Sequence, residues 1–199
     1  MINKGISKSL DDNKIFYLLS AIFIAIGVIM GIYCVKYLSA NENESIAKYI
    51  DTVLKGSSGE IRNASVFFEA LKNNMMFLLA YLFLGITVVG IPIILIINII
   101  KGFTIGFSFS FFISKVAEKG IRLAIFAMIP QNIIYISCIT AASAIAMKYS
   151  INRIKRKGTV CDLSIKKYIG NMIVFTGIII LGAIFESFLS PFLIKVILK

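Results

Sequence analysis

The side chains that could carry out chemistry are few in this sequence, and their spacing does not assemble a reactive set. No histidine occurs, which removes Ser-His and Cys-His nucleophile pairs, HExxH zinc sites and haem ligation by histidine. No GxGxxG or Walker A run is present either. The aspartates lie outside the long apolar runs, at Asp11, Asp12, Asp51 and Asp162. We therefore predict that the chain is not an enzyme and that it holds no cofactor or metal.

One acid, Glu186, falls within an apolar run near the end of the sequence. An ionisable group inside a membrane span is costly, so it is a candidate for function. Two interpretations stay open. Glu186 is either an interfacial acid that pairs with Lys115, Lys119 or Arg122, or a residue that binds a partner.

The other notable residues within apolar runs are amides and glycines. Pro130, Gln131 and Asn132 predict a broken helix with two amides beside unpaired backbone groups, a pattern found both in substrate sites and in helix-helix contacts. Gly102 and Gly106 have GxxxG spacing, which allows helices to approach closely. This spacing predicts packing within the chain, with homodimerisation through the same face as the alternative.

The elements that must position these residues are predicted to be transmembrane helices. Hydrophobic residues make up 58% of the 199 residues and the mean hydropathy is +0.90, above the roughly 45–50% apolar share of a soluble domain. The formal net charge of +11 comes from basic residues that flank apolar runs, which is typical of membrane orientation and not of nucleic-acid binding. The three cysteines share no CxxC spacing and predict no disulfide framework.

The lengths of the apolar runs predict an all-α, polytopic bundle of five spans, since about 20 residues cross a hydrocarbon core of about 30 Å. The run 73–114 is about twice that length and must turn once, at Gly90-Ile91-Pro92 or at Lys101-Gly102. In the first case Lys101 lies near the bilayer centre, at a nominal cost of about 2.5–3.5 kcal/mol unless it is paired. The predicted single domain 1–199 has spans 15–38, 73–90, 91–115 or 102–121, 122–148 and 168–191, with an outer loop 39–72 and a basic loop 148–167.

The distribution of lysine and arginine predicts the orientation of the bundle. Basic residues dominate the segment 148–167, whereas acids balance them in the segment 36–72. Because positive charge accumulates on the cytoplasmic side, the N-terminus is expected inside and the C-terminus outside the cell membrane.

The outer loop shows helical spacing of apolar residues on both sides of a Gly-Ser break at 56–59. This predicts two short amphipathic helices, whose apolar faces either rest on the outer headgroups or bind extracytoplasmic partners. The candidate partner-binding residues are Ile46, Ile50, Val53, Leu54 and Phe68.

Four short motifs follow one another along residues 14–195. They contain Gly85, Gly90 and Pro92; then Lys101, Gly102 and Gly106; then Pro130, Gln131 and Asn132; and finally the run from Glu186 to Pro191. Together, in this order and spacing, they resemble the signatures of the stage II sporulation protein M family.

The resemblance implies a scaffold in the bacterial cell membrane, at the sporulation septum and the engulfing mother-cell membrane. In this family the scaffold anchors two peptidoglycan-degrading partners, stage II sporulation proteins D and P, during engulfment. The alternative is a permease-like or energy-coupling subunit that works with a separate ATPase. A mid-depth cavity lined by Asn98, Lys101, Gln131 and Asn132 would favour that alternative, and a tightly packed interior would count against it.

Overall fold

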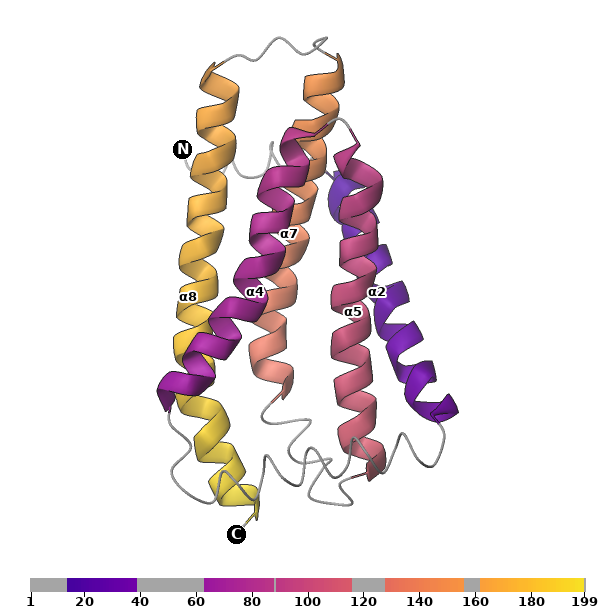
Figure 1. Ribbon diagram of the computed structural model, residues 1–199, viewed down its shortest axis with the longest axis vertical. Helices are drawn as coiled ribbons and strands as arrows, with labels where there is room; N and C mark the ends of the chain where they lie inside the picture. Colours follow the sequence, from indigo (N-terminus) through magenta and orange to yellow (C-terminus); the bar gives the residue numbers. More distant parts are fainter. Residues whose placement is uncertain (1–13, 39–62, 88, 116–127, 156–161, 199) are drawn as a thin grey trace.

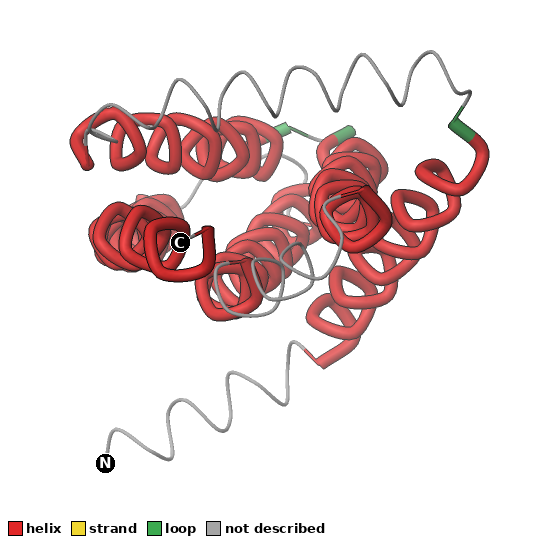
Figure 2. The backbone as a smooth tube through the Cα atoms, turned by 90° about the horizontal axis from the view of Figure 1, so that it is seen from below, coloured by secondary structure: helices red, strands yellow, loops and turns green. Residues whose placement is uncertain are grey.

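The computed structural model describes residues 14–38, 63–87, 89–115, 128–155 and 162–198. Within these ranges the chain is helical apart from Leu38 and the turn between α4 and α5, and it contains no strand (Figures 1 and 2). Each helix contains a stretch that is long and apolar enough to cross a membrane. The prediction of an all-α bundle of five spans is therefore confirmed. The helices are α2 (Lys14–Tyr37), α4 (Asn63–Ile86), α5 (Gly90–Lys115), α7 (Ile129–Lys155) and α8 (Asp162–Leu198).

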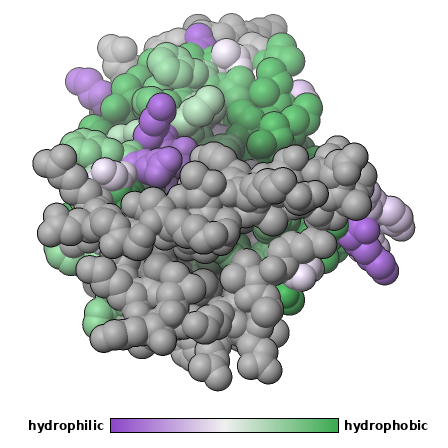
Figure 3. Space-filling model, turned by 60° about the horizontal axis from the view of Figure 1, so that its bottom comes forward, coloured by the Kyte–Doolittle hydropathy of each residue, from purple (hydrophilic) through white to green (hydrophobic). Residues whose placement is uncertain are grey.

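Large apolar side chains lie on the outside of the helices. Met76 of α4 is 73% exposed and Leu181 of α8 is 68% exposed. Hydrophobic residues cover much of the described surface in Figure 3, and hydrophilic ones are confined to a few separate places. In water such a surface would cause association, whereas in lipid it is the ordinary outer face of a spanning bundle.

The turn between α4 and α5 settles the position that the sequence left open. α4 ends at Ile86 and α5 begins at Gly90, so the alternative turn at Lys101-Gly102 is wrong and that pair lies inside α5. The backbone N–H and the hydroxyl of Thr87 both donate to the Leu84 carbonyl, at 3.0 and 2.8 Å. These bonds satisfy a carbonyl that the end of a helix leaves unpaired. A Cβ at Gly90 would collide with the same carbonyl, so this turn requires glycine.

Two of the prolines lie close to the starts of helices. Pro92 lies in the first turn of α5, as predicted for a turn at Gly90, where a missing N–H would have had no helical partner. Pro130 is the second residue of α7, and because residues 116–127 lie outside the described residues, the predicted break of the fourth span at Pro130 stays a prediction. α8 continues through Pro191 to Leu198, so the fifth helix does not end at this proline. Transmembrane helices tolerate proline when neighbouring groups satisfy the freed carbonyls.

Helices extend into two of the predicted loops. In the outer loop 39–72, the residues from Asn63 on, with Phe68 among them, belong to the first turns of α4. No glycine or proline separates them from the span, so one continuous helix forms. The basic loop 148–167 likewise includes the last turns of α7 and the first turns of α8. The other predicted amphipathic helix lies outside the described residues, with Ile46, Ile50, Val53 and Leu54.

α2 and α5 form the most extensive helix pair of the bundle and lie side by side (Figure 1). Gly27 and Gly31 of α2 pack against α5, and Gly102 and Gly106 of α5 pack against α2. A Cβ at any of the four would collide with backbone atoms of the opposite helix. Lipid supplies no hydrophobic drive between helices, so close backbone packing holds the pair together. The predicted GxxxG face is thus covered within the chain.

Aromatic packing joins α7 and α8 to α4. The rings of Tyr149 and Tyr168 stack with their centroids 4.4 Å apart. The Tyr168 hydroxyl donates to the Tyr81 carbonyl of α4 at 2.8 Å. Gly85 leaves room for this hydroxyl, because a Cβ there would collide with it. The first span-forming turns of α8 are thereby fixed against α4.

One end of the bundle carries the α4–α5 turn, the last turns of α7 and the first turns of α8 (Figure 1). We call it the basic end, after Lys148, Arg153, Lys166 and Lys167. The Ser150 hydroxyl donates to the Thr87 carbonyl at 2.8 Å, and the Arg153 guanidinium donates to the Ile86 carbonyl. A cation at a helix C-terminus also complements the helix dipole. These bonds tie the turn to α7.

The glycine contact predicts a position-specific effect of adding one methyl group. Gly102→Ala should lower the free energy of unfolding by about 1–3 kcal/mol, because the methyl group has no space against α2. Gly177→Ala in α8 is the matched control, since its Cβ would meet nothing within 4 Å. It should change stability by about 1 kcal/mol or less, in the stabilising direction. Unfolding in detergent measures the free energy of unfolding of both variants. Equal losses in the two variants would contradict the glycine contact between α2 and α5.

Candidate functional site

Four polar side chains from four helices meet inside the bundle. Asn98 of α5 donates through Nδ2 to the hydroxyls of Ser20 in α2 (3.0 Å) and Ser143 in α7 (3.4 Å). Its Oδ1 accepts from the Tyr81 hydroxyl of α4 (2.8 Å), and the two serines share a further hydrogen bond. All four side chains are 0% exposed. We call them the Asn98 cluster.

The Asn98 cluster fixes the relative position of its helices. A polar group surrounded by apolar side chains costs free energy unless its hydrogen bonds are made. Here the amide of one residue binds three other helices at once, so a shift of any helix along its axis would leave a buried group unpaired. Hydrogen bonds of this kind are a common source of helix association in membranes.

One turn further along α5, Lys101 is buried near the middle of its span and 7% exposed. Its depth is about 16 Å along the helix from Gly90. The ammonium donates to Asn74 Oδ1 at 2.8 Å and lies 4.9 Å from the centroid of the Phe77 ring. Asn74 in turn donates to the Ala70 carbonyl at 2.9 Å. These contacts with α4 offset the cost of a cation at this depth.

Glu186 lies against α7 and is half-buried. Its carboxylate accepts a hydrogen bond from the Tyr135 hydroxyl at 2.8 Å. Lys101 and Glu186 carry opposite charges within the bundle, and no ion pair joins them. The predicted partners Lys119 and Arg122 lie outside the described residues, as does the side chain of Lys115. The described contacts of Glu186 are thus within the bundle.

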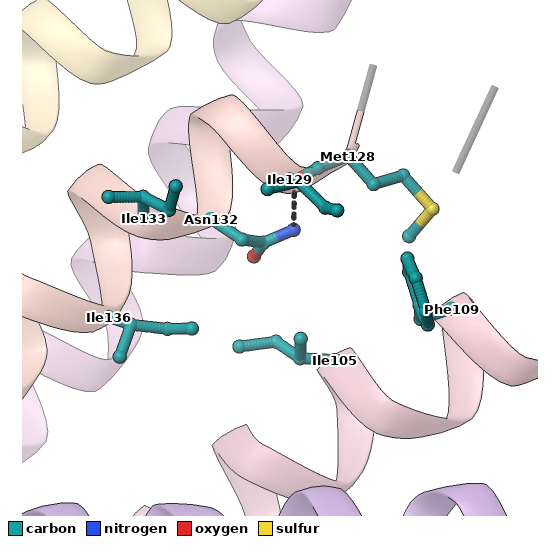
Figure 4. A pocket seen from close by; sticks show the side chains of 7 residues that line it. All are labelled: Ile105, Phe109, Met128, Ile129, Asn132, Ile133 and Ile136. Atoms are coloured by element: carbon teal, nitrogen blue, oxygen red, sulfur yellow. Dashed lines mark hydrogen bonds between the residues drawn. The ribbon is translucent and has the colours of Figure 1, made fainter. Parts of the chain in front are cut away.

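The two amides of α7 lie apart from the Asn98 cluster. Gln131 and Asn132 are half-buried, and Asn132 Nδ2 donates to the Met128 carbonyl at 2.8 Å (Figure 4). Asn132 borders a cavity of about 140 Å³ between α5 and α7, whose other walls are apolar. Neither Asn98 nor Lys101 lines this cavity. The residues that would form a permease-like polar cavity are therefore not gathered around one space.

The arrangement supports hydrogen bonding and packing more than reaction chemistry. Within the described ranges no three His, Cys, Asp or Glu side chains come close enough to hold a metal ion. The serine hydroxyls of the Asn98 cluster bond the Asn98 amide and each other, and neither group is a general base for a nucleophile. The Lys101 ammonium donates a hydrogen bond to the side-chain oxygen of Asn74.

Some of the other residues predicted from the sequence lie in the described helices, and others lie outside the described residues. Phe68 lies in the second turn of α4, 67% exposed, with its ring edge-on to Phe67 at 5.5 Å. The candidates at 46–54 lie outside the described residues. The other motif residues take structural positions: Gly85 beside Tyr168, Gly90 at the turn, and the GxxxG pair of α5 against α2.

Several interior residues are absent from the sequence prediction. The partner of the α5 GxxxG pair is a second GxxxG pair, Gly27 and Gly31, which the same spacing marks in the first span. Asn74 also carried a signal, since an amide inside an apolar run needs a partner. Ser20, Tyr81 and Ser143 carried none, because single hydroxyls are common in spans and nothing in their spacing shows that they meet.

Comparison with known protein families matches residues 20–191 to stage II sporulation protein M. The chain belongs to this family. No curated protein and no solved structure matches it significantly. As a member of the stage II sporulation protein M family, the chain is a sporulation-related membrane protein, and the family is not a known family of enzymes. The match includes the Asn98 cluster, Lys101 and Glu186.

The Asn98 cluster predicts a loss of stability when its central amide is removed. Asn98→Leu should lower the free energy of unfolding by about 1–3 kcal/mol, because buried hydroxyls on three helices lose their partner. Thr104→Val is the control on the same helix: Thr104 is exposed and its hydroxyl bonds only the Ile100 carbonyl of its own helix. That variant should stay within about 0.5 kcal/mol. Equal losses in detergent unfolding would show that the cluster is not a tertiary constraint.

The opposite charges of Lys101 and Glu186 predict non-additive substitutions. Lys101→Met and Glu186→Gln should each destabilise the bundle, because each removes one of two opposite charges and leaves the other with only its neutral partners, Tyr135 for Glu186 and Asn74 for Lys101. The double variant should be more stable than the sum of the two losses, with a coupling of about 1 kcal/mol. A double-mutant cycle of unfolding free energies in detergent measures this coupling. Additivity within about 0.5 kcal/mol would exclude it.

Proposed function

We propose that the chain is a non-enzymatic membrane scaffold that anchors peptidoglycan-degrading partners, stage II sporulation proteins D and P, at the septal membrane during engulfment. Membership of the stage II sporulation protein M family supports a role in sporulation. The observation that carries the proposal is the Asn98 cluster, in which four fully buried side chains bond one another. An interior closed in this way leaves its surface and its ends for binding.

The distribution of charge supports a specific orientation for the scaffold. The basic end carries Lys148, Arg153, Lys166 and Lys167. Because lysine and arginine accumulate on the cytoplasmic side, this end lies in the cytoplasm in our proposal. The N-terminus is then cytoplasmic and the C-terminus extracytoplasmic, and the first turns of α4 face the cell wall. Peptidoglycan is also on that side.

Phe68 is the described residue best placed to contact such a partner. It lies five residues after the start of α4, at the end of the helix opposite to the basic end, and is 67% exposed. A large aromatic side chain exposed at a membrane boundary can bury much apolar area against a partner, and it loses little side-chain entropy on binding. The candidates Ile46, Ile50, Val53 and Leu54 precede it in sequence and remain part of the proposal.

The alternative function, a permease-like subunit coupled to an ATPase, requires polar space at mid-depth. The described interior is packed there, with Asn98 at 0% and Lys101 at 7% exposure, both bonded to neighbouring helices. Asn132 borders a separate cavity with apolar walls. These observations favour the scaffold over the permease.

Site-specific cross-linking tests the proposed contact in sporulating cells. A photoreactive residue at Phe68 should cross-link to stage II sporulation protein D or P. The matched control is Phe83, which is 66% exposed on the same helix but lies three residues before its end at Ile86, close to the basic end. It should give lipid adducts and no hydrolase adduct. Hydrolase adducts at both positions, or at neither, would contradict a contact at the wall-facing end of α4.

A further inference from the structure

The cavity of about 140 Å³ between α5 and α7, which we call the α5–α7 cavity, lies in the half of the bundle away from the basic end (Figure 4). Of the described residues that line it, Asn132 alone is polar, and the other walls are apolar side chains such as Ile105 and Phe109. Ile133, which also lines it, is 60% exposed, so the cavity reaches the lipid-facing side of the bundle. An engineered apolar cavity of about 150 Å³ in another protein stays dry and binds benzene. The α5–α7 cavity is therefore large enough for one aromatic ring.

The amide of Asn132 has one oxygen that the described residues leave unpaired. Its Nδ2 donates to the Met128 carbonyl at 2.8 Å. Its Oδ1 points into the space between α5 and α7 and accepts no hydrogen bond from a described residue (Figure 4). An unpaired carbonyl oxygen in apolar surroundings costs free energy. A favourable occupant of the cavity therefore brings an O–H or N–H donor together with apolar surface.

The depth of the α5–α7 cavity limits where that donor can come from. The span in α5 ends at Ser114, so Phe109 and Ile105 lie about 8 and 14 Å inside that end. At this depth lipid offers acyl chains, which have no hydrogen-bond donor. A buried water needs two or more polar partners, and the described residues around the cavity offer one. The remaining source of a donor is a side chain on a membrane helix.

The chain itself presents such a side chain at the matching depth. Tyr33 of α2 is 56% exposed, and no described residue bonds its hydroxyl. α2 and α5 run in the same direction, and Gly31 of α2 packs against Phe107 of α5 (Figure 1). Tyr33 lies two residues beyond Gly31, about 3 Å, which places it level with the α5–α7 cavity. Side chains on a helix lean toward its N-terminus, so the Tyr33 ring leans toward the membrane interior.

We propose that a second copy of the chain inserts Tyr33 into the α5–α7 cavity, where the ring fills the apolar space and the hydroxyl donates to Asn132 Oδ1. Two copies that span one membrane in the same orientation hold these two groups at the same depth. Tyrosine matches the cavity because its ring is apolar and its one polar group is a donor. Each copy carries both halves of this contact, as an assembly of identical chains requires. The contact lies apart from Phe68 and does not depend on hydrolase binding.

Self-association of the purified full-length chain in phosphatidylcholine liposomes tests the proposal. Fluorescence energy transfer between labelled copies, measured at increasing dilution in lipid, gives the dissociation constant. Tyr33→Phe removes only the hydroxyl and should weaken association about threefold to tenfold, the usual effect of one hydrogen bond between membrane helices. The matched control is Tyr37→Phe: Tyr37 is 80% exposed one turn further along α2, and this variant should leave the dissociation constant unchanged.

A second set of variants tests whether Tyr33 and Asn132 bond each other. Asn132→Leu should weaken association by a similar factor, and adding Tyr33→Phe to it should cause no further loss, because both remove the same bond. Copies with Tyr33→Phe mixed with copies with Asn132→Leu should associate more tightly than either variant alone, since the mixed pair keeps one intact contact. Tyr33→Phe and Tyr37→Phe replace exposed residues, so their comparison stands even if Asn132→Leu aggregates in size-exclusion chromatography.

Three results would overturn the proposed contact. The first is a chain that stays monomeric at every dilution, and the second is a dissociation constant that Tyr33→Phe leaves unchanged or that Tyr37→Phe raises equally. The third is a lipid that native mass spectrometry finds on the monomer and that Ile105→Phe removes, which would assign the α5–α7 cavity to an acyl chain.

Discussion

A buried amide surrounded by lipid-embedded helices must find its hydrogen-bond partners within the protein, and the rest of this bundle is arranged around that constraint. Asn98 meets it with one side chain from each of three other helices. Only one relative position of α2, α4, α5 and α7 allows all these bonds at once. The close packing of glycines between α2 and α5 brings Ser20 to Asn98, and Tyr168 then fixes α8 against α4.

The charged groups of the interior must likewise find their partners within the protein. Lys101 lies at the depth where a cation is most costly, and an amide and an aromatic ring contact its ammonium. Glu186 is in turn bonded to Tyr135. Because these groups satisfy one another, the interior favours one rigid arrangement over a path for substrate. A rigid bundle with binding surfaces at its ends is what a membrane scaffold requires.

Much of the fold could be predicted from the sequence, because hydropathy and the length of apolar runs alone identify membrane spans. Gly90 could be named as a turn candidate, but the choice against Lys101-Gly102 needed the contacts that compensate Lys101. Helix ends at Asn63 and Leu198 could not be read from hydropathy, since helices continue past the apolar core. The Asn98 cluster could not be predicted from the sequence. Which hydroxyls of separate helices meet depends on how each helix is rotated about its axis, and no local sequence pattern encodes that rotation.

We propose that this family member acts by placing hydrolases at the septum. Fluorescent fusions of stage II sporulation proteins D and P, imaged in sporulating cells with and without the chain, show where the hydrolases lie. Both hydrolases should concentrate at the septal membrane when the chain is present and disperse along the membrane when it is absent. Unchanged septal fluorescence in cells that lack the chain would show that the chain does not place them there.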